Sequence, residues 1–425
     1  SATLSPLRSP GDSGIRPHWV QWKRCPGLLI GASWIVLETH RREDYDGGQT
    51  RRKVMSDTGL VAAFTGVRKP FALLEFPVPE AEPGAVVVRL TMANVCGSDL
   101  HIWRGTYDVS RGHSEPFCLS IGHEMTGVVH ELGEGVASDS AGDQLSVGDR
   151  VVFQYFVGCG ECRSCRRETT PRCPEGLKYR FPPDQYPHFT AAYGQYYYLR
   201  PGQAVFKVPD NVPDELAGPA NCALAQVIDG LERGNAGPGD RLVIQGAGGL
   251  GLNAVAVARE RGVSQVIVID GVESRLELAL AFGADQVIDL NEFPTTGDRV
   301  RRVLELTDGE GADLVMELVG KAEAVPEAIG MLAHGGTLLE IGNINQGQTV
   351  TLDPSQLVHG GKTILGMMWY RPQSLQAALQ MLSESATRYP FDRVLSHSYP
   401  LTEVDQAFAD QDTGAVQRAA LLPWG

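Results

Sequence analysis

The sequence predicts an α/β protein with a β-rich first part and a doubly wound parallel sheet in its second part. Between residues 61 and 208, short apolar runs are separated by Gly and Pro, a rhythm typical of strands in a compact barrel or sandwich. From Asp240 onward, apolar runs alternate with helical segments, as expected where helices cover both faces of a parallel sheet. The 425 residues, 43% of them hydrophobic, suffice for two or three domains with sizeable cores, which excludes disorder as the main state.

In the first part, three apolar runs carry the clearest strand signal. They are Val86–Leu90, Gly127–Leu132 and Arg150–Phe153. In the second part, six buried strands are expected at Leu242–Gln245, Val266–Ile269, Gln286–Leu290, Leu314–Val319, Thr337–Ile341 and Thr363–Met367. The predicted helices are Leu252–Arg261 and Glu273–Phe282, closed by Gly262 and Gly283, and then Ser374–Leu382 before a mixed tail.

The first 54 residues differ from the rest of the chain. They hold nine Lys or Arg against five Asp or Glu and show no sustained helical or strand period, and Met55 is the first methionine. We expect a poorly ordered N-terminal extension that is dispensable for the rest of the protein. A targeting or partner-binding arm is the alternative.

Charge and cysteine content restrict the class of partner. The net charge of −14 argues against nucleic acid or an anionic membrane surface, and no apolar run approaches the roughly 20 residues of a membrane span. Eight cysteines, clustered in a long chain without a secretory signal, favour metal binding and a reducing, cytoplasmic setting. Cys25 and Cys118 fall outside any pattern; for Cys118 we expect a buried position.

The string Gly246-Ala247-Gly248-Gly249-Leu250-Gly251 follows a predicted strand and opens a predicted helix, as the dinucleotide fingerprint requires. Gly246 allows the tight turn, Gly248 the approach of a pyrophosphate, and Gly251 the packing of helix on strand. Asp270 ends the next strand, where its carboxylate would accept both ribose hydroxyls and repel a 2′-phosphate. A glycine turn with an unrelated surface Asp is the alternative.

Four cysteines within 15 residues, Cys159, Cys162, Cys165 and Cys173, match a closed tetrahedral zinc site with no position for substrate. Two disulfides are the alternative. A second set consists of Cys96-Gly-Ser98-Asp99-Leu-His101, the Gly122-His123-Glu124 string and Cys222. Cys96, His123 and Cys222 would supply the three ligands of a catalytic zinc with one open position, although each alone is more often a buried packing residue.

These strings, in this order and spacing, make the chain from about residue 60 resemble the zinc-containing alcohol dehydrogenases of the medium-chain dehydrogenase/reductase superfamily. The resemblance implies a GroES-like catalytic domain over residues 55–225 that contains the structural zinc lobe. It implies a Rossmann NAD-binding domain over residues 226–369 and a C-terminal segment, residues 370–425, that completes the catalytic domain. We therefore expect two zinc ions per chain and a homodimer or homotetramer.

The resemblance also implies residue roles. Cys96, His123 and Cys222 would hold the catalytic zinc, with Glu124 as a nearby carboxylate and Asp99 fixing the tautomer of His123. Ser98 would hold the substrate oxygen and His101 would end a proton relay to solvent. The remaining expected contacts are Tyr107 and Tyr155 at the substrate, and Gly249, Leu250 and Arg275, beside the fingerprint glycines, at the cofactor.

The activity implied is reversible hydride transfer between an alcohol and the nicotinamide of NAD, with zinc lowering the pKa of the alcohol. Members that act on polyols or threonine usually carry Glu at the position of Cys222, so we expect an apolar or aromatic substrate; a polyol or another hydroxyl compound is the alternative. Zinc-free quinone or enoyl reductases lack these cysteines. An inactive nucleotide-binding scaffold is the alternative from a different class.

Overall fold

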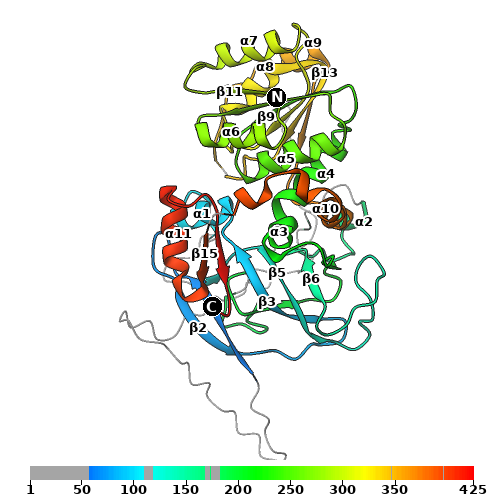
Figure 1. Cartoon of the computed structure of the whole chain (residues 1–425), viewed down its shortest axis with the longest axis vertical. Coiled ribbons are helices and arrows are strands. Elements are labelled where there is room, and N and C mark those ends of the chain that lie inside the picture. The colour runs from blue at the N-terminus through cyan, green and yellow to red at the C-terminus, as the bar shows by residue number, and fades with distance from the viewer. Residues whose placement is uncertain (1–56, 110–117, 168–172, 174–181, 346, 396) are drawn as a thin grey trace, which may run out of the picture.

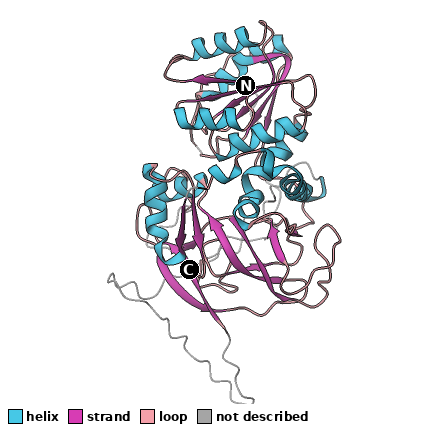
Figure 2. Cartoon of the chain, viewed as in Figure 1, coloured by secondary structure: helices cyan, strands magenta, loops and turns pink. Residues whose placement is uncertain are grey.

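The structure is a computed structural model that describes residues 57–109, 118–167, 173, 182–345, 347–395 and 397–425. The expectations for the N-terminal extension and for Cys25 lie outside these residues. The described chain forms a β-rich domain and a second domain built on one sheet (Figures 1 and 2). No helix of the described ranges combines the length and the apolar character that a membrane crossing requires.

The β-rich domain contains two sheets. The smaller has the order β2-β1-β4, and the larger has the order β15-β16-β3-β5-β6-β8 with β7 also paired to β3. Their bounds are β1 Thr58–Phe64, β2 Ala72–Pro77, β3 Val86–Asn94, β4 Leu119–Ser120, β5 Glu124–Leu132, β6 Arg150–Phe153, β7 Tyr196–Leu199, β8 Val205–Lys207, β15 His397–Pro400 and β16 Ala419–Leu422. The last strand, β16, pairs antiparallel with β3, so the C-terminal segment returns to the first domain.

The second domain is a six-stranded parallel sheet of order β11-β10-β9-β12-β13-β14. Its strands are β9 Arg241–Gln245, β10 Gln265–Asp270, β11 Gln286–Asp289, β12 Ala312–Glu317, β13 Leu332–Glu340 and β14 Thr363–Gly366. The order steps outward from β9 in both directions, which confirms the predicted doubly wound, Rossmann-like sheet.

The helices are α1 Gly97–Arg104, α2 Arg163–Arg167, α3 Asp214–Pro219, α4 Ala225–Arg233, α5 Gly249–Glu260, α6 Glu273–Ala281, α7 Thr296–Leu306, α8 Ala324–Met331, α9 Ser355–Gly360, α10 Pro372–Ser385 and α11 Val404–Thr413, with a π-helical turn η2 over Ala220–Leu224. Neighbouring residues of β9 face opposite cores. Ile244 packs in one cluster with Val255 of α5, whereas Val243 packs in another with Ile329 of α8. Helices therefore cover both faces of the sheet, which explains its continuous apolar strands.

Most predicted elements differ from the observed ones by a few residues at one or both ends, and two of these differences have a clear local cause. Helix α5 begins at Gly249 rather than at Leu252, because Gly248 takes an extended conformation and the helix starts inside the glycine string. Strand β12 ends at Glu317 rather than at Val319, because the Glu317 carboxylate accepts the N–H groups of Val319 and Gly320 and turns the chain. Cys118 is buried, as expected.

Candidate active site

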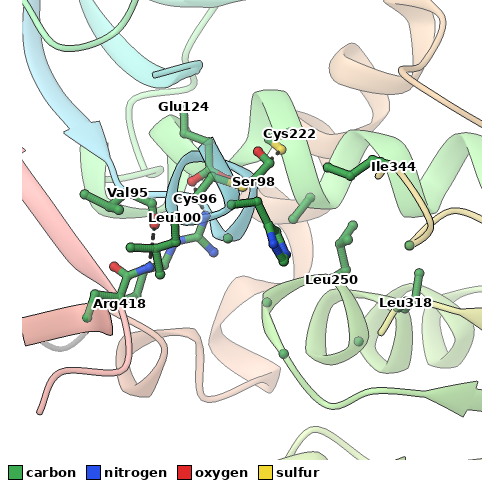
Figure 3. A pocket seen from close by; sticks show the side chains of 18 of the residues that line it. Val95, Cys96, Ser98, Leu100, Glu124, Cys222, Leu250, Leu318, Ile344 and Arg418 are labelled. Atoms are coloured by element: carbon green, nitrogen blue, oxygen red, sulfur yellow. Dashed lines mark hydrogen bonds and ion pairs between the residues drawn. The ribbon is translucent and has the colours of Figure 1, made fainter. Parts of the chain in front are cut away.

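A cavity of about 710 Å³ lies between the two domains and receives side chains from both (Figure 3). Cys96, Ser98 and Glu124 lie on one side, and Leu250, Leu318 and Ile344 of the sheet domain lie on the other. The sequence-predicted residues that line it are Cys96, Ser98, His101, Tyr107, His123, Glu124, Tyr155, Cys222, Gly248, Gly249, Leu250, Gly251 and Arg275. The fold thus brings residues far apart in the chain to one cavity.

Three metal-ligating side chains converge at the wall of this cavity. The Sγ atom of Cys222 lies 4.0 Å from Sγ of Cys96 and 3.3 Å from Nε2 of His123. A tetrahedral zinc with ordinary bond lengths separates its ligand atoms by about 3.5–3.8 Å. Two thiols and an imidazole at these spacings therefore fit zinc. A Glu124 carboxylate oxygen belongs to the same group of ligand atoms, all within 4.8 Å of one another.

Each of the three side chains comes from a different element. Cys96 is the N-cap residue of α1, and His123 directly precedes β5. Cys222 lies in the π-helical turn η2, a wide turn that often marks functional sites. This turn is anchored at Asn221, the residue before the cysteine: the Asn221 side-chain amide donates to the Phe153 carbonyl at 3.0 Å, and the Tyr370 hydroxyl donates to the Asn221 carbonyl.

Asp99 ties two of these residues together. Its Oδ1 lies 3.3 Å from Nδ1 of His123, on the side of the ring away from Cys222. Its Oδ2 accepts the Cys96 backbone N–H at 3.0 Å and the Tyr193 hydroxyl at 2.8 Å. The carboxylate thereby orients the imidazole and the N-cap of α1 together. Sequence reasoning missed Tyr193, which lies 94 residues from Asp99.

The electrostatics of the cluster follow from burial and close contacts. A hydrogen bond from the Cys222 thiol, together with the nearby His123, holds the pKa of Cys96 well below its ordinary value. Burial alone lowers the pKa of His123, but the charges of Asp99 and Cys96 outweigh it and raise that pKa well above its usual range. The cluster therefore favours one thiolate even without a metal.

Glu124 is paired with an arginine that sequence reasoning did not single out. Both side chains are buried, and the Arg418 guanidinium donates to the Glu124 carboxylate. Burial raises the pKa of Glu124 to about 8, although the charge of Arg418 opposes that rise. The Arg418 guanidinium also lies against Gly249, since a Cβ atom there would come within 2.8 Å of its Nη1. Arg418 therefore connects the metal-ligating cluster to the glycine string.

The remaining substrate-side predictions lie along the same wall. Ser98 and His101 come from successive turns of α1, and Nδ1 of His101 lies 2.9 Å from the Thr106 hydroxyl. Burial lowers the pKa of His101, and the charge of Arg104 adds to that effect. The ring of Tyr155 lies 4.7 Å from the His123 ring, and Tyr107 also lines the cavity.

The glycine string has the geometry that the fingerprint requires. Gly246 has a φ of 99°, in the left-handed region that favours glycine, and a Cβ on Gly251 would lie 1.9 Å from the Gly246 carbonyl oxygen. The φ of Gly246 allows the tight turn, and the absence of a Cβ at Gly251 lets α5 pack on β9, as predicted. The N-terminus of α5 thus faces the cavity with Gly248 and Gly249.

Asp270 has a different environment from the one expected. Its Oδ1 accepts the N–H groups of Gly271 and Val272, and its Oδ2 accepts the N–H of Ala247 at 2.7 Å. Nη1 of Arg275 lies 4.0 Å from Oδ2. Asp270 is not among the described residues that line the cavity, whereas Arg275 is. The carboxylate holds the glycine turn in place, and acceptance of both ribose hydroxyls stays a prediction.

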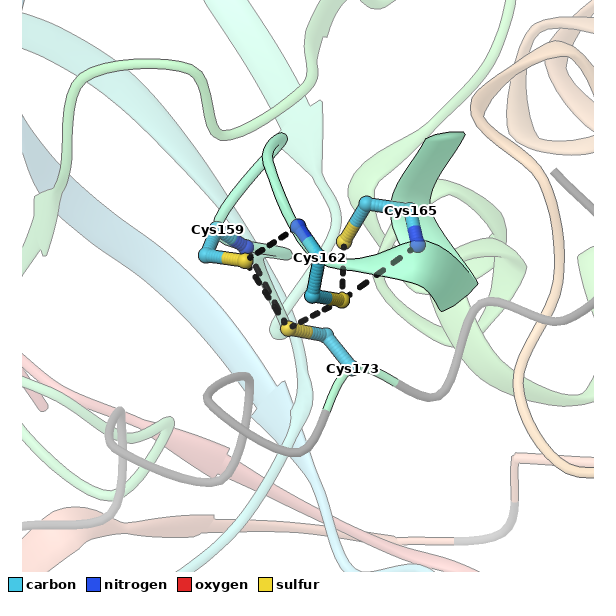
Figure 4. A group of neighbouring side chains, drawn as sticks. All are labelled: Cys159, Cys162, Cys165 and Cys173. Atoms are coloured by element: carbon cyan, nitrogen blue, oxygen red, sulfur yellow. Dashed lines mark hydrogen bonds between the residues drawn. The ribbon is translucent and has the colours of Figure 1, made fainter. Parts of the chain in front are cut away.

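The four-cysteine lobe is drawn in Figure 4. Sγ of Cys162 lies 3.5 Å from that of Cys165 and 3.7 Å from that of Cys173, and Cys173 lies 3.5 Å from Cys159. A disulfide requires about 2.05 Å between sulfur atoms, so none of these four cysteines forms a disulfide with another. The distances are close to the roughly 3.8 Å edge of a tetrahedral Zn–S4 site, which the donor set fits.

Comparison with known proteins assigns the chain to a family. The family described as "Zinc-binding dehydrogenase" matches residues 249–384, and "Alcohol dehydrogenase GroES-like domain" matches residues 82–210. The 5-exo-hydroxycamphor dehydrogenase of Pseudomonas putida is 31% identical over 343 residues, 80% of this chain and 92% of that protein. The chain belongs to the zinc-dependent alcohol dehydrogenases of the medium-chain superfamily. It is an oxidoreductase of this family, as predicted.

Other relatives carry different substrate names. The erythritol/L-threitol dehydrogenase of Mycolicibacterium smegmatis is 31% identical over 341 residues, 78% of this chain and 89% of that protein. The L-threonine 3-dehydrogenase of Bacillus licheniformis is 28% identical over 371 residues, 86% of this chain and all of that protein.

Among solved structures, an alcohol dehydrogenase from Thermotoga maritima has a TM-score of 0.77 at 26% identity, and the match covers 86% of this chain and 100% of that chain. The GroES-like and Rossmann-like architecture of this dehydrogenase is therefore established.

Proposed function

We propose that this dehydrogenase transfers hydride between NAD and an apolar or aromatic alcohol, or the corresponding aldehyde or ketone. The observation that carries the proposal is a single cavity lined by Cys96, His123 and Cys222 at one end and by the glycine string at the other. An alcohol beside the three ligands and a nicotinamide entering from the string would meet in that cavity. Proximity of this kind is what hydride transfer needs from the protein.

Cys96, His123 and Cys222 would hold one zinc ion and the four lobe cysteines a second. At the first site zinc would supply a Lewis acid that lowers the pKa of an alcohol. Ser98 would accept the hydroxyl proton of the substrate, and His101 would pass a proton toward Thr106 and the outside. Asp99 would keep the imidazole of His123 in one orientation, which its 3.3 Å separation from Nδ1 supports.

For the cofactor, Arg418 and the N–H groups at the start of α5 would face the pyrophosphate. The negative charge of Asp270 disfavours a 2′-phosphate, whereas Arg275 would favour one. Because the Asp270 carboxylate lies 4.0 Å from Nη1 of Arg275, its charge offsets the guanidinium that lines the cavity, and we expect NAD to be preferred about tenfold or more.

For the substrate, Tyr107 and Tyr155 support an apolar pocket, since aromatic walls offer few partners for extra hydroxyls. The hydroxycamphor dehydrogenase relative, named for a cyclic alcohol, agrees with this choice. The erythritol and threonine dehydrogenase relatives support the alternative of a polyol or another hydroxyl compound. An inactive scaffold is disfavoured because the metal-ligating set and Ser98 are all present at the cavity.

The decisive experiment compares benzyl alcohol, cyclohexanol, 1-propanol, sorbitol and threonine with NAD and with NADP, after zinc analysis of the same sample. We expect two zinc ions per chain, the highest kcat/KM for a ring alcohol, and NAD ahead of NADP. One zinc per chain would contradict the two-site assignment. A highest kcat/KM for sorbitol or threonine would contradict the apolar pocket, and equal kcat/KM values for the two cofactors would contradict the role of Asp270.

We also propose a homodimer or homotetramer. Strand β14 is one of the two outer strands of the sheet in the described part of the chain, and it pairs only with β13 there. Val358, just before it, is 77% exposed, and Ile364 within it is 40% exposed. An apolar, unpaired sheet edge is a surface that a second copy would cover.

A further inference from the structure

Trp369 has a backbone conformation that bulky side chains rarely adopt. Its φ is 68°, in the left-handed region, where a Cβ atom is unfavourable. Arg68, His188, Asn235 and Asp308 share this property in the described chain, but of the five only Trp369 lines the cavity. Strained backbone of this kind concentrates where a ligand must be clamped, so its position is the first indication of a function.

The structure around Trp369 holds that conformation in place. On the C-terminal side, the Tyr370 hydroxyl donates to the Asn221 carbonyl in the turn that carries Cys222, and the Tyr370 carbonyl accepts the Gln154 side-chain amide at 3.0 Å. On the N-terminal side, the Met367 N–H donates to the Glu340 carbonyl at 2.9 Å. The backbone is thus fixed on both sides of the strained residue, and this fixes the point from which the indole projects.

The indole belongs to a continuous row of rings that ends at a metal-ligating side chain. It stacks on Phe156, with ring centroids 4.8 Å apart and planes at 8°. Phe156 meets Tyr155 edge to face at 5.0 Å, and Tyr155 lies 4.7 Å from the His123 ring. Trp369 and Phe156 are each 4% exposed, so the row is closely packed. The row spans the two domains, since Trp369 follows β14 and Phe156 follows β6.

We propose that Trp369 is a specificity-determining residue that gives the alcohol end of the cavity a rigid, flat wall suited to ring-shaped substrates. This inference rests on the proposed function and extends it from an apolar pocket to one that selects rings over linear chains. A fixed aromatic plane gains contact with a planar or alicyclic ring without losing rotamer freedom, whereas a linear chain covers less of it. Tyr370, by contrast, is a positioning residue for the turn of Cys222.

The test compares Trp369→Gly with Trp369→Phe. Glycine removes the indole and adopts the left-handed backbone without strain, so this variant should fold. Phenylalanine keeps an aromatic plane. We expect Trp369→Gly to lower the ratio of kcat/KM for benzyl alcohol to that for 1-propanol by about tenfold, and Trp369→Phe to change it less than about threefold. Trp424→Gly is the matched control, because that indole stacks on Arg89 outside the cavity and should leave the ratio unchanged.

A second measurement does not depend on turnover. The dissociation constant of benzyl alcohol, measured by calorimetry on the zinc-loaded protein saturated with NADH, should rise about tenfold in Trp369→Gly and stay within threefold in Trp369→Phe. Phe156→Leu, which removes the stacking partner, should shift it in the same direction by a smaller factor.

An unchanged ratio and an unchanged dissociation constant in Trp369→Gly would overturn the proposal. If Trp369→Gly is unfolded at the assay temperature, the same two measurements on Phe156→Leu decide whether the proposal holds. If the wild type oxidises none of the alcohols, the proposed function fails separately, and the benzyl alcohol dissociation constants still decide whether Trp369 contacts the ligand.

Discussion

The two cysteine clusters of this dehydrogenase present similar donor atoms in different settings. The lobe takes its four thiols from residues 159 to 173, and none of them lines the described cavity. The cavity cluster takes its ligands from three elements spread between Cys96 and Cys222, and all three line the cavity. A closed set of four ligands is typical of a structural metal, whereas three ligands beside an open space are typical of a catalytic one. Ligand count and access therefore separate the roles better than ligand type.

The clusters also differ in what holds them together. Around the cavity, Asp99, Tyr193 and the anchored turn at Cys222 fix the ligands through hydrogen bonds from other elements. In the lobe, the contacts that the structure gives run largely among the cysteines themselves. We infer that the protein preorganises the cavity cluster, while a metal would supply much of the folding energy of the lobe.

The largest expected effect separates the two clusters by substitution. Cys96→Ala should lower kcat/KM by about a thousandfold or more, because several kcal/mol of Lewis-acid stabilisation are lost, while the melting temperature stays within a few degrees. Cys162→Ala should lower the melting temperature by roughly 10 °C and release the zinc of the lobe. Calorimetry, zinc analysis and steady-state kinetics on both variants check this. Equal losses of stability in the two variants would show that the clusters do not differ as argued.

The next effect concerns the buried ion pair beside the cavity cluster, which has no counterpart in the described part of the lobe. Above pH 8, where Glu124 is ionised, Arg418→Met should lower the free energy of unfolding by about 3–5 kcal/mol, because it leaves the Glu124 carboxylate buried without its partner. Urea denaturation measures it, and zinc bound by the lobe should be retained. Adding Glu124→Gln should recover much of the loss. Arg68→Met, at an exposed ion pair with Asp412, is the control and should cost less than about 1 kcal/mol.

The last effect lies in the sheet domain, away from either cluster, and is spread over several pH units. Glu317 and Glu340 end neighbouring strands, and both accept the Asn343 side-chain amide, at 3.1 and 3.0 Å. Burial and the nearby Glu340 raise the pKa of Glu317 from 4.5 to about 8. The folded protein therefore keeps this proton up to about pH 8, whereas the unfolded chain loses it above about 4.5, so stability falls as pH rises between those values.

Glu317→Gln should flatten that part of the stability profile, as followed by melting temperature at several pH values. Part of the slope should remain in this variant, because Glu124 in the cavity cluster also has its pKa raised to about 8 and acts over the same pH range. A slope that is unchanged in Glu317→Gln would place its whole origin at the cavity cluster instead.

Local patterns in the sequence were enough for the fold class, the six parallel strands, the glycine string and the four-cysteine lobe. Each depends on residues close together in the chain, where spacing limits the geometry: Cys159 to Cys173 span 15 residues, and Gly246 to Gly251 form one turn. The set of Cys96, His123 and Cys222 spans 126 positions, and its role was expected only from the family resemblance. Element ends were less predictable. Helix α5 starts at Gly249 because a glycine with low helix propensity can still begin a helix when tertiary packing requires it.

Tertiary structure alone decided the groups that complete the site. Arg418 meets Glu124 across 294 positions, Tyr193 meets Asp99 across 94, and Tyr370 meets Asn221 across 149. It also placed Asp270 under the glycine turn, away from the cavity wall, and Trp369 against Phe156 in a left-handed conformation. Short-range patterns do not encode these contacts, because each joins segments that only the folded chain brings together. The contact of Arg418 with Glu124, for example, requires β16 to pair with β3. The sequence by itself therefore determined which reactive side chains are present. The packing of distant segments decided how those side chains are paired and oriented, and which residues enclose them.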